Sequence, residues 1–131
     1  MRFKQIGHTA DIGIVAYGKD LNKLFENAAF GMFSVLTDIS LVKQSGELKV
    51  KAAGMDRENL LVNWLNELLY QAGKRKMLFS GFRLDKISQK NGKYFLDVGT
   101  PYGVNVMKPW SQVSMVRLDG APHGAHIIPE E

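Results

Sequence analysis

Cysteine is absent from this sequence, histidine occurs only three times, and no stretch approaches the roughly 20 consecutive apolar residues of a membrane-spanning helix. The lack of cysteine excludes disulfides, thiolate nucleophiles and cysteine-rich zinc sites, and it fits a reducing compartment. Residues 1–20 also lack the continuous apolar segment of a secretion signal. We therefore expect a soluble cytoplasmic protein that makes no contact with a membrane.

Neither sign of charge dominates, because 17 basic residues face 13 acidic ones and leave a net charge of +4. This balance favours phosphate-rich or acidic partners but is far from that of a dedicated nucleic-acid-binding protein. No repeat is visible in the sequence. A chain of 131 residues with 45% hydrophobic residues is expected to form a single domain over residues 1–131.

Two segments carry apolar residues at helical spacing. Asp20 is expected to cap the first helix, whose apolar stripe runs from Leu21 to Phe33. Asp56 is expected to cap the second helix, and Gly73 is expected to end it in a left-handed conformation. Leucines and Trp64 form a wide apolar face on this second helix, so Trp64 is predicted to lie in the core.

The remaining segments favour strands. Alternating or short apolar patterns predict strands over residues 1–6, 12–16, 47–53, 79–90, 93–98, 104–107 and 112–118. Asn91-Gly92 is the dipeptide best suited to a two-residue type I′ turn, so the strands on either side of it should form a hairpin. The sequence predicts an α+β single domain with an antiparallel or mixed β-sheet and two α-helices packed on one face.

The densest polar region is His8-Thr9-Ala10-Asp11, which leads into the second predicted strand. An acid at a strand entrance is held by the sheet while its oxygens stay available, so Asp11 is the first candidate for chemistry. His8 and Asp11 are both expected in a loop, where they could face one pocket. The alternative is that Asp11 accepts hydrogen bonds from amides of its own turn and His8 packs over it.

Three sequence strings resemble the archease family. They are His8-Thr9-Ala10-Asp11-Ile12-Gly13-Ile14, then Leu24-Phe25-Glu26-Asn27-Ala28-Ala29 continuing through Met32-Phe33 to Leu36-Thr37-Asp38, and finally Asn59-Leu60-Leu61-Val62-Asn63-Trp64-Leu65-Asn66-Glu67-Leu68-Leu69-Tyr70. The strings occur in the family's order, and the resemblance covers residues 1 to about 98.

This resemblance implies a non-catalytic accessory protein of the tRNA-splicing RNA ligase, which would meet tRNA through the ligase complex. Members of the family assist guanylylation of the ligase and so restore it for further turnovers, using a bound divalent cation. In the family, the aspartate of the first string holds that cation together with a C-terminal Asp-Ile or Asp-Val pair. The resemblance therefore assigns Asp11 as a metal ligand, and its oxygens suit Ca²⁺ or Mg²⁺.

Residues 99–131 depart from the family pattern. Where archeases carry Val-Lys-Ala-Val-Thr-Tyr-His, this sequence has residues 113–119 without the lysine, tyrosine or histidine, and the ligand pair has no counterpart. Glu130 and Glu131 offer the same type of oxygen and are the candidate replacements, with a solvated charged tail as the alternative. Lys108 or Arg117 could replace the lost lysine, although neither occupies its position.

Weaker candidates and other functions remain open. Lys74-Arg75-Lys76 could bind a phosphate or simply interact with the helix dipole, and His123 with His126 could bind a transition metal or lie in a disordered tail. Asp38 is expected to form a turn. The alternative functions are a metal-dependent phosphoesterase that uses Asp11 and His8, and an RNA-binding or chaperone-like module.

Overall fold

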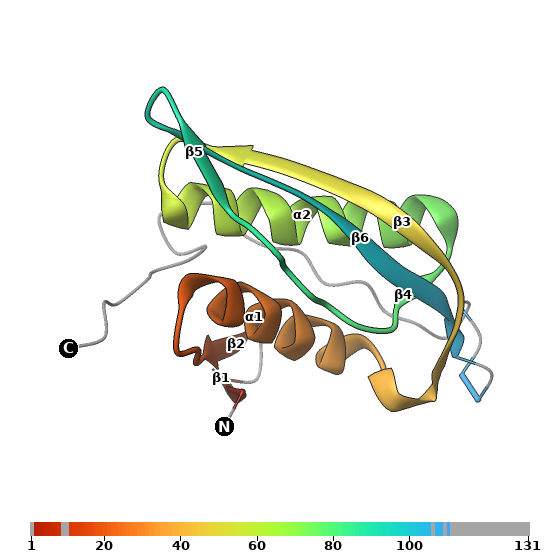
Figure 1. Ribbon diagram of the computed structural model, residues 1–131. Coiled ribbons are helices and arrows are strands. Elements are labelled where there is room, and N and C mark those ends of the chain that lie inside the picture. Colours follow the sequence, from red (N-terminus) through yellow and green to blue (C-terminus); the bar gives the residue numbers. More distant parts are fainter. Residues whose placement is uncertain (1, 9–10, 106, 109, 111–131) are drawn as a thin grey trace.

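The computed structural model describes residues 2–8, 11–105, 107, 108 and 110, and for residues 5–8 and 11–14 it describes the backbone only. Its elements are, in chain order, β1 (Phe3–His8), β2 (Asp11–Ala16), α1 (Leu21–Leu36), the short 3₁₀ helix η1 (Ile39–Leu41), β3 (Val42–Gly54), α2 (Arg57–Arg75), β4 (Leu78–Phe79), β5 (Ser88–Lys90) and β6 (Lys93–Asn105). The predicted α+β class is confirmed (Figure 1).

The strands of the described residues form two antiparallel sheets, where the sequence led us to expect one. β1 pairs with β2 in a two-stranded sheet, whereas β6 pairs with β3, β4 and β5 in a four-stranded one. Helix α2 packs against β3, and α1 packs against the β1–β2 hairpin. The apolar stripes of the two helices also meet each other and β4, since Phe25 of α1 contacts Trp64 of α2 and Phe33 of α1 contacts Phe79.

An aromatic cluster forms the centre of the core between the two helices and the larger sheet. Trp64 and Phe25 are completely buried, with ring centroids 5.9 Å apart in a stacked arrangement. Phe33 and Phe79 are also completely buried and meet edge to face at 5.5 Å. Such pairs add stability beyond the area that they bury. The prediction that Trp64 lies in the core is confirmed.

The helix starts follow the predicted caps, but one helix end does not. The Asp20 carboxylate accepts a hydrogen bond from the amide of Lys23 at 2.8 Å, and that of Asp56 accepts one from Asn59 at 2.7 Å. The prediction that Gly73 ends the second helix is wrong. Helix α2 continues to Arg75, and Lys76 takes the left-handed conformation with φ 53° while its amide donates to the carbonyl of Ala72.

The predicted hairpin at Asn91-Gly92 is confirmed, since both residues have positive φ and Lys90 pairs with Lys93. The strand expected over 79–90 is wrong in its middle, because regular pairing is confined to β4 and β5. The strand expected over 104–107 is instead the end of β6, which stops at Asn105. The one expected over 112–118 lies outside the described residues.

A structural repeat joins strand to helix twice, although none was visible in the sequence. Gly18 and Gly54 each come two residues before a capping aspartate, and a Cβ on either would overlap the backbone of a leucine six residues later. Asn27 and Asn63 then donate from the helices to the carbonyls of Tyr17 and Ala53. Only these few positions are shared, which explains why the sequence pattern concealed the repeat. We call the two segments the first junction (residues 17–27) and the second junction (residues 53–63).

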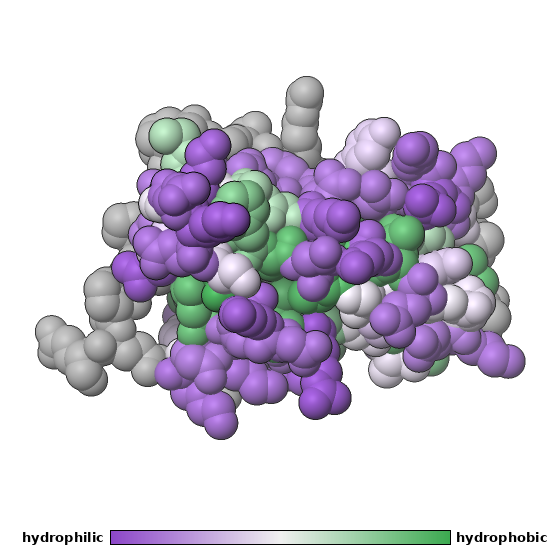
Figure 2. Space-filling view, turned by 45° about the horizontal axis from the view of Figure 1, so that its top comes forward, coloured by the Kyte–Doolittle hydropathy of each residue, from purple (hydrophilic) through white to green (hydrophobic). Residues whose placement is uncertain are grey.

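Hydrophilic side chains predominate over the molecular face in Figure 2, with hydrophobic ones gathered in a central band. Neither helix in the described part of the chain combines the length and the hydrophobicity needed to cross a membrane.

Candidate functional site

Asp11 and His8 lie opposite each other at one end of the β1–β2 ladder. Asp11 is the first residue of β2 and His8 the last of β1, and their Cα atoms are partners in the antiparallel register. Both residues therefore belong to strands, which corrects the expectation of a loop. The expectation that Asp11 stands at a strand entrance holds, while Thr9 and Ala10, which connect the strands, lie outside the described residues.

The opposite end of this ladder is anchored on α1. The Phe3 ring lies 6.0 Å from that of Phe30, and the guanidinium of Arg2 stands 4.3 Å above the same Phe30 ring. The amide of Tyr17 donates to the carbonyl of Arg2 at 2.9 Å. This bond continues the pairing of the two chain segments one residue beyond Phe3 and Ala16. Strand rise places Asp11 roughly 17 Å from the anchored end. The hairpin thus presents Asp11 at a distance from the helix that holds it.

The other predicted ligands cannot be placed beside Asp11. Glu130 and Glu131 lie outside the described residues, as do Arg117, His123 and His126. Among residues 2–4, 15–105, 107, 108 and 110, whose side chains the structure describes, no three histidine or acidic side chains gather as a metal site would require. Asp11, Glu130 and Glu131 as metal ligands therefore stay predictions.

Buried polar residues that the sequence analysis missed fix the exit of the chain from β6. Asn105, only 5% exposed, donates from Nδ2 to Oγ1 of Thr37 at 2.8 Å. Its Oδ1 accepts from the amides of Met107 at 2.9 Å and Lys108 at 3.2 Å. Thr37 follows the last residue of α1, so this cluster ties the end of that helix to the end of β6. Thr37 stands in an archease-like string, whereas no pattern marked Asn105.

Asp38, from the same string, caps η1. Its carboxylate accepts hydrogen bonds from the amide of Ser40 at 3.1 Å and from the Ser40 hydroxyl at 2.6 Å. The turn predicted at this position is confirmed. One carboxylate oxygen is thereby committed to holding its own backbone.

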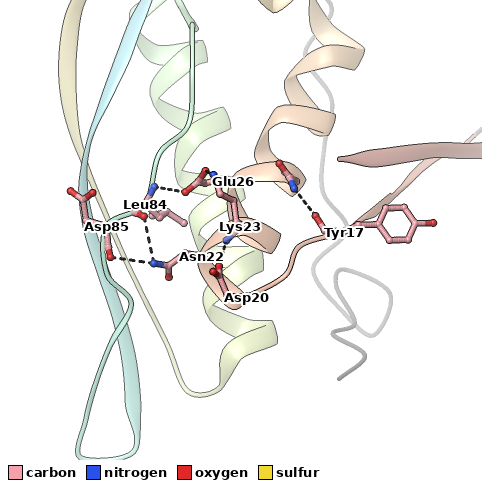
Figure 3. Close-up of polar contacts among 8 residues, drawn as sticks. Tyr17, Asp20, Asn22, Lys23, Glu26, Leu84 and Asp85 are labelled. Carbon is pink, nitrogen blue, oxygen red and sulfur yellow. Dashed lines mark hydrogen bonds and ion pairs between the residues drawn. The ribbon is translucent and has the colours of Figure 1, made fainter. Parts of the chain in front are cut away.

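Glu26 and Asn22 of α1 hold the connection between β4 and β5, as Figure 3 shows. Oε2 of Glu26 accepts from the amide of Leu84 at 3.0 Å, and Oε1 lies 3.2 Å from Nζ of Lys23. Asn22 donates to the carbonyl of Asp85 at 3.2 Å and, at 3.5 Å, to that of Leu84. Glu26, which belongs to the second archease-like string, thus helps Asn22 to position a neighbouring segment.

Comparison with known proteins gives a family model and several relatives. The model of the Archease protein family (MTH1598/TM1083) matches residues 3–113. The protein archease of Sulfurisphaera tokodaii is 48% identical over 90 residues, which cover 69% of this chain and 64% of that protein. The protein archease of Methanosarcina barkeri is 40% identical over 93 residues, covering 71% of this chain and 64% of that protein.

A solved structure supports the same relationship. The solution structure of protein 1598 from Methanobacterium thermoautotrophicum matches with a TM-score of 0.69 and 36% identity, covering 88% of this chain and 81% of that chain. The chain spans a little under two thirds of the length of the first two relatives. The family match over most of the chain shows that this protein belongs to the archease family.

Proposed function

We propose that the protein is a non-catalytic accessory factor of a tRNA-splicing RNA ligase in the cytoplasm. It promotes guanylylation of the ligase and its multiple turnover, and it meets tRNA through the ligase complex. Membership of the archease family supports the accessory role in RNA processing. The ligase as partner and the dependence on a cation extend that role and are the parts to be tested.

The observation that carries this proposal is the position of the His8–Asp11 string. His8 and Asp11 occupy one end of a hairpin whose other end is fixed to α1 by Arg2, Phe3 and Phe30. A functional group on a strand with paired backbone is held more rigidly than one in a long loop. The hairpin is thus suited to presenting a carboxylate to a partner protein.

In this proposal Asp11 is a ligand of Ca²⁺ or Mg²⁺, since carboxylate oxygens suit both ions. One carboxylate does not make a site, and the described residues supply no cluster of three acids or histidines. Glu130 and Glu131 are the proposed further ligands. A bound divalent cation would supply positive charge that neutralises phosphate groups during guanylyl transfer. The described residues give no observation that favours the phosphoesterase hypothesis.

The test replaces Asp11 with asparagine, which keeps the shape of the side chain and removes its charge. We expect Asp11→Asn to abolish Ca²⁺ binding in calorimetric titration and to abolish stimulation of ligase guanylylation. The free energy of unfolding should change by less than about 1 kcal/mol.

The matched control is Asp85→Asn. Asp85 is exposed, and its contact with Asn22 uses the backbone carbonyl, which the substitution leaves in place. The control should bind the cation and stimulate the ligase like the original protein. Full stimulation by a stable Asp11→Asn protein would contradict the proposed role of Asp11.

A further inference from the structure

The larger sheet has one face in the core and one face in solvent. Leu96 and Val98 of β6 and Val50 of β3 are buried in the core. The residues between them alternate to the other side and are exposed, among them Lys51 of β3 and Phe95 of β6. The register places Lys51 opposite Asp97 and Ala53 opposite Phe95, so the alternation in the two strands is in phase.

Phe95 is an aromatic side chain on this exposed face with small residues on both sides. It is 38% exposed, and its register partners are Ala53 on β3 and Ser88 on β5. Because directly opposed residues on neighbouring strands share a face, neither small partner can cover the ring as a large side chain would. An exposed ring of this kind offers a surface on which a planar group can stack.

Three lysines surround this ring. Lys93 lies two residues before Phe95 on β6, and it pairs in register with Lys90 of β5. Lys51 lies two residues before Ala53 on β3. Neighbouring strands lie about 4.8 Å apart, and alternate residues lie about 7 Å apart along a strand. Each of the three lysines is therefore one such step along a strand from Phe95 or from one of its register partners. We call Lys51, Ala53, Ser88, Lys90, Lys93 and Phe95 the Phe95 patch.

Asp97 lies two residues after Phe95 on the same face and opposite Lys51, so with the three lysines this part of the face still carries a net positive charge. Within the described residues, the one ion pair that involves this face joins Lys49 to Asp97, with Nζ and Oδ2 3.7 Å apart. That pair involves none of the three lysines of the Phe95 patch. Exposed lysines around an aromatic ring match the two features of a nucleic-acid strand, its phosphates and its bases.

We propose that the Phe95 patch binds unpaired RNA, with one base stacked on Phe95 and the adjoining phosphates bound by Lys51, Lys90 and Lys93. The choice of RNA over DNA rests on the proposed function in RNA ligation, whereas the location of the site rests on the geometry alone. An acidic protein surface would use the lysines but would gain nothing specific from a stacked ring. This contrast provides the test.

The experiment measures the affinity of the full chain for a short unstructured RNA by fluorescence anisotropy, with chelator present and without ligase. We expect Phe95→Leu, which keeps an apolar side chain but removes the stacking surface, to weaken binding about tenfold. The triple variant Lys51→Gln, Lys90→Gln, Lys93→Gln should reduce the slope of log affinity against log salt by about 2, since each phosphate contact contributes about 0.7.

The matched control is a second triple variant with the same net charge: Lys4→Gln, Lys19→Gln, Lys43→Gln. These lysines are exposed and lie on β1, before α1 and at the other end of β3 from Lys51. The control should keep nearly the original affinity and salt slope. Equal losses in the two triple variants, or an unchanged affinity in Phe95→Leu, would overturn the proposal.

Polyglutamate provides a competitor that carries negative charge without bases. We expect it to displace the RNA poorly, and equal displacement at matched charge would overturn the proposal in favour of an acidic protein partner. Because RNA affinity is measured without ligase or cation, its failure is distinguishable from a failure of the proposed role of Asp11.

Discussion

The first and second junctions share one arrangement but differ in what their helices hold. In each, a glycine lets a strand end lie against the first turn of a helix, an aspartate caps that helix and an asparagine returns to the strand. At the first junction, Asn22 and Glu26 also hold residues more than 50 positions away.

At the second junction the additional polar contacts stay local. The Oδ1 of Asn59 accepts from the amide of Met55 at 3.0 Å and lies 3.3 Å from the Nδ2 of Asn63. The equivalent of Glu26 is Val62, which is buried in the apolar face of α2. The comparison shows that the shared residues specify the turn from strand to helix, and the residues between them decide whether the helix also holds a distant segment.

Substitution of the two junction glycines should have the largest effect. A methyl group at Gly18 or Gly54 would overlap the backbone of Leu24 or Leu60. We expect Gly18→Ala and Gly54→Ala each to lower the free energy of unfolding by about 3 kcal/mol in denaturant titration. Gly73→Ala is the control, because a Cβ there meets nothing within 4 Å. It should raise stability by about 0.5–1 kcal/mol. If either junction variant were as stable as this control, the two junctions would not be equivalent.

Removal of the Glu26 carboxylate tests the contact that is special to the first junction. The Glu26 side chain is only 12% exposed and accepts from the amide of Leu84. We expect Glu26→Ala to cost about 2 kcal/mol, because a partly buried amide loses its partner. Hydrogen exchange of the Leu84 amide should accelerate.

The control for Glu26 is Glu58→Ala in the first turn of α2, where Glu58 is half-buried. This change should cost only a few tenths of a kcal/mol, through the helix dipole. Unchanged exchange at Leu84 in a folded Glu26→Ala protein would show that α1 does not hold the β4–β5 connection.

Loss of either capping aspartate should have a smaller effect. We expect Asp20→Ala and Asp56→Ala each to lower the free energy of unfolding by about 1 kcal/mol, because an amide of the first helical turn loses its acceptor. Asparagine at either position should restore most of the loss. The two caps share no partner, so the double alanine variant should show the sum. A marked departure from that sum in thermal or denaturant unfolding would show that the junctions are coupled.

Local patterns were sufficient to predict the parts of the fold that depend on neighbours in sequence. Asp20, Asp56 and the Asn91-Gly92 turn were identified because caps and tight turns satisfy backbone groups a few residues away. Gly73 was misassigned because a glycine ends a helix only where it comes just after the last helical residue. Helix α2 runs on to Arg75, so Gly73 lies inside it.

Features that depend on distant residues escaped prediction. The sequence pattern predicted that the last hairpin strand ends at Val98, whereas β6 continues to Asn105. In β6, Gly99 leaves room for the side chain of Glu47 on β3. Prediction of the candidate metal site is limited in the same way. A site that joins Asp11 to the end of the chain depends on where the fold places that end, and local sequence patterns do not determine this.

The anchoring of the β1–β2 hairpin at Phe30 makes that ring a pivot. Over roughly 17 Å of ladder, a tilt of about 5° at the pivot displaces the far end by about 1.5 Å. A shift of that size is enough to spoil the alignment of groups that must meet in a reaction. The size of the side chain at position 30 therefore influences where the Asp11 end of the hairpin lies. It does so through the contacts of Phe30 with Arg2 and Phe3 at the opposite end.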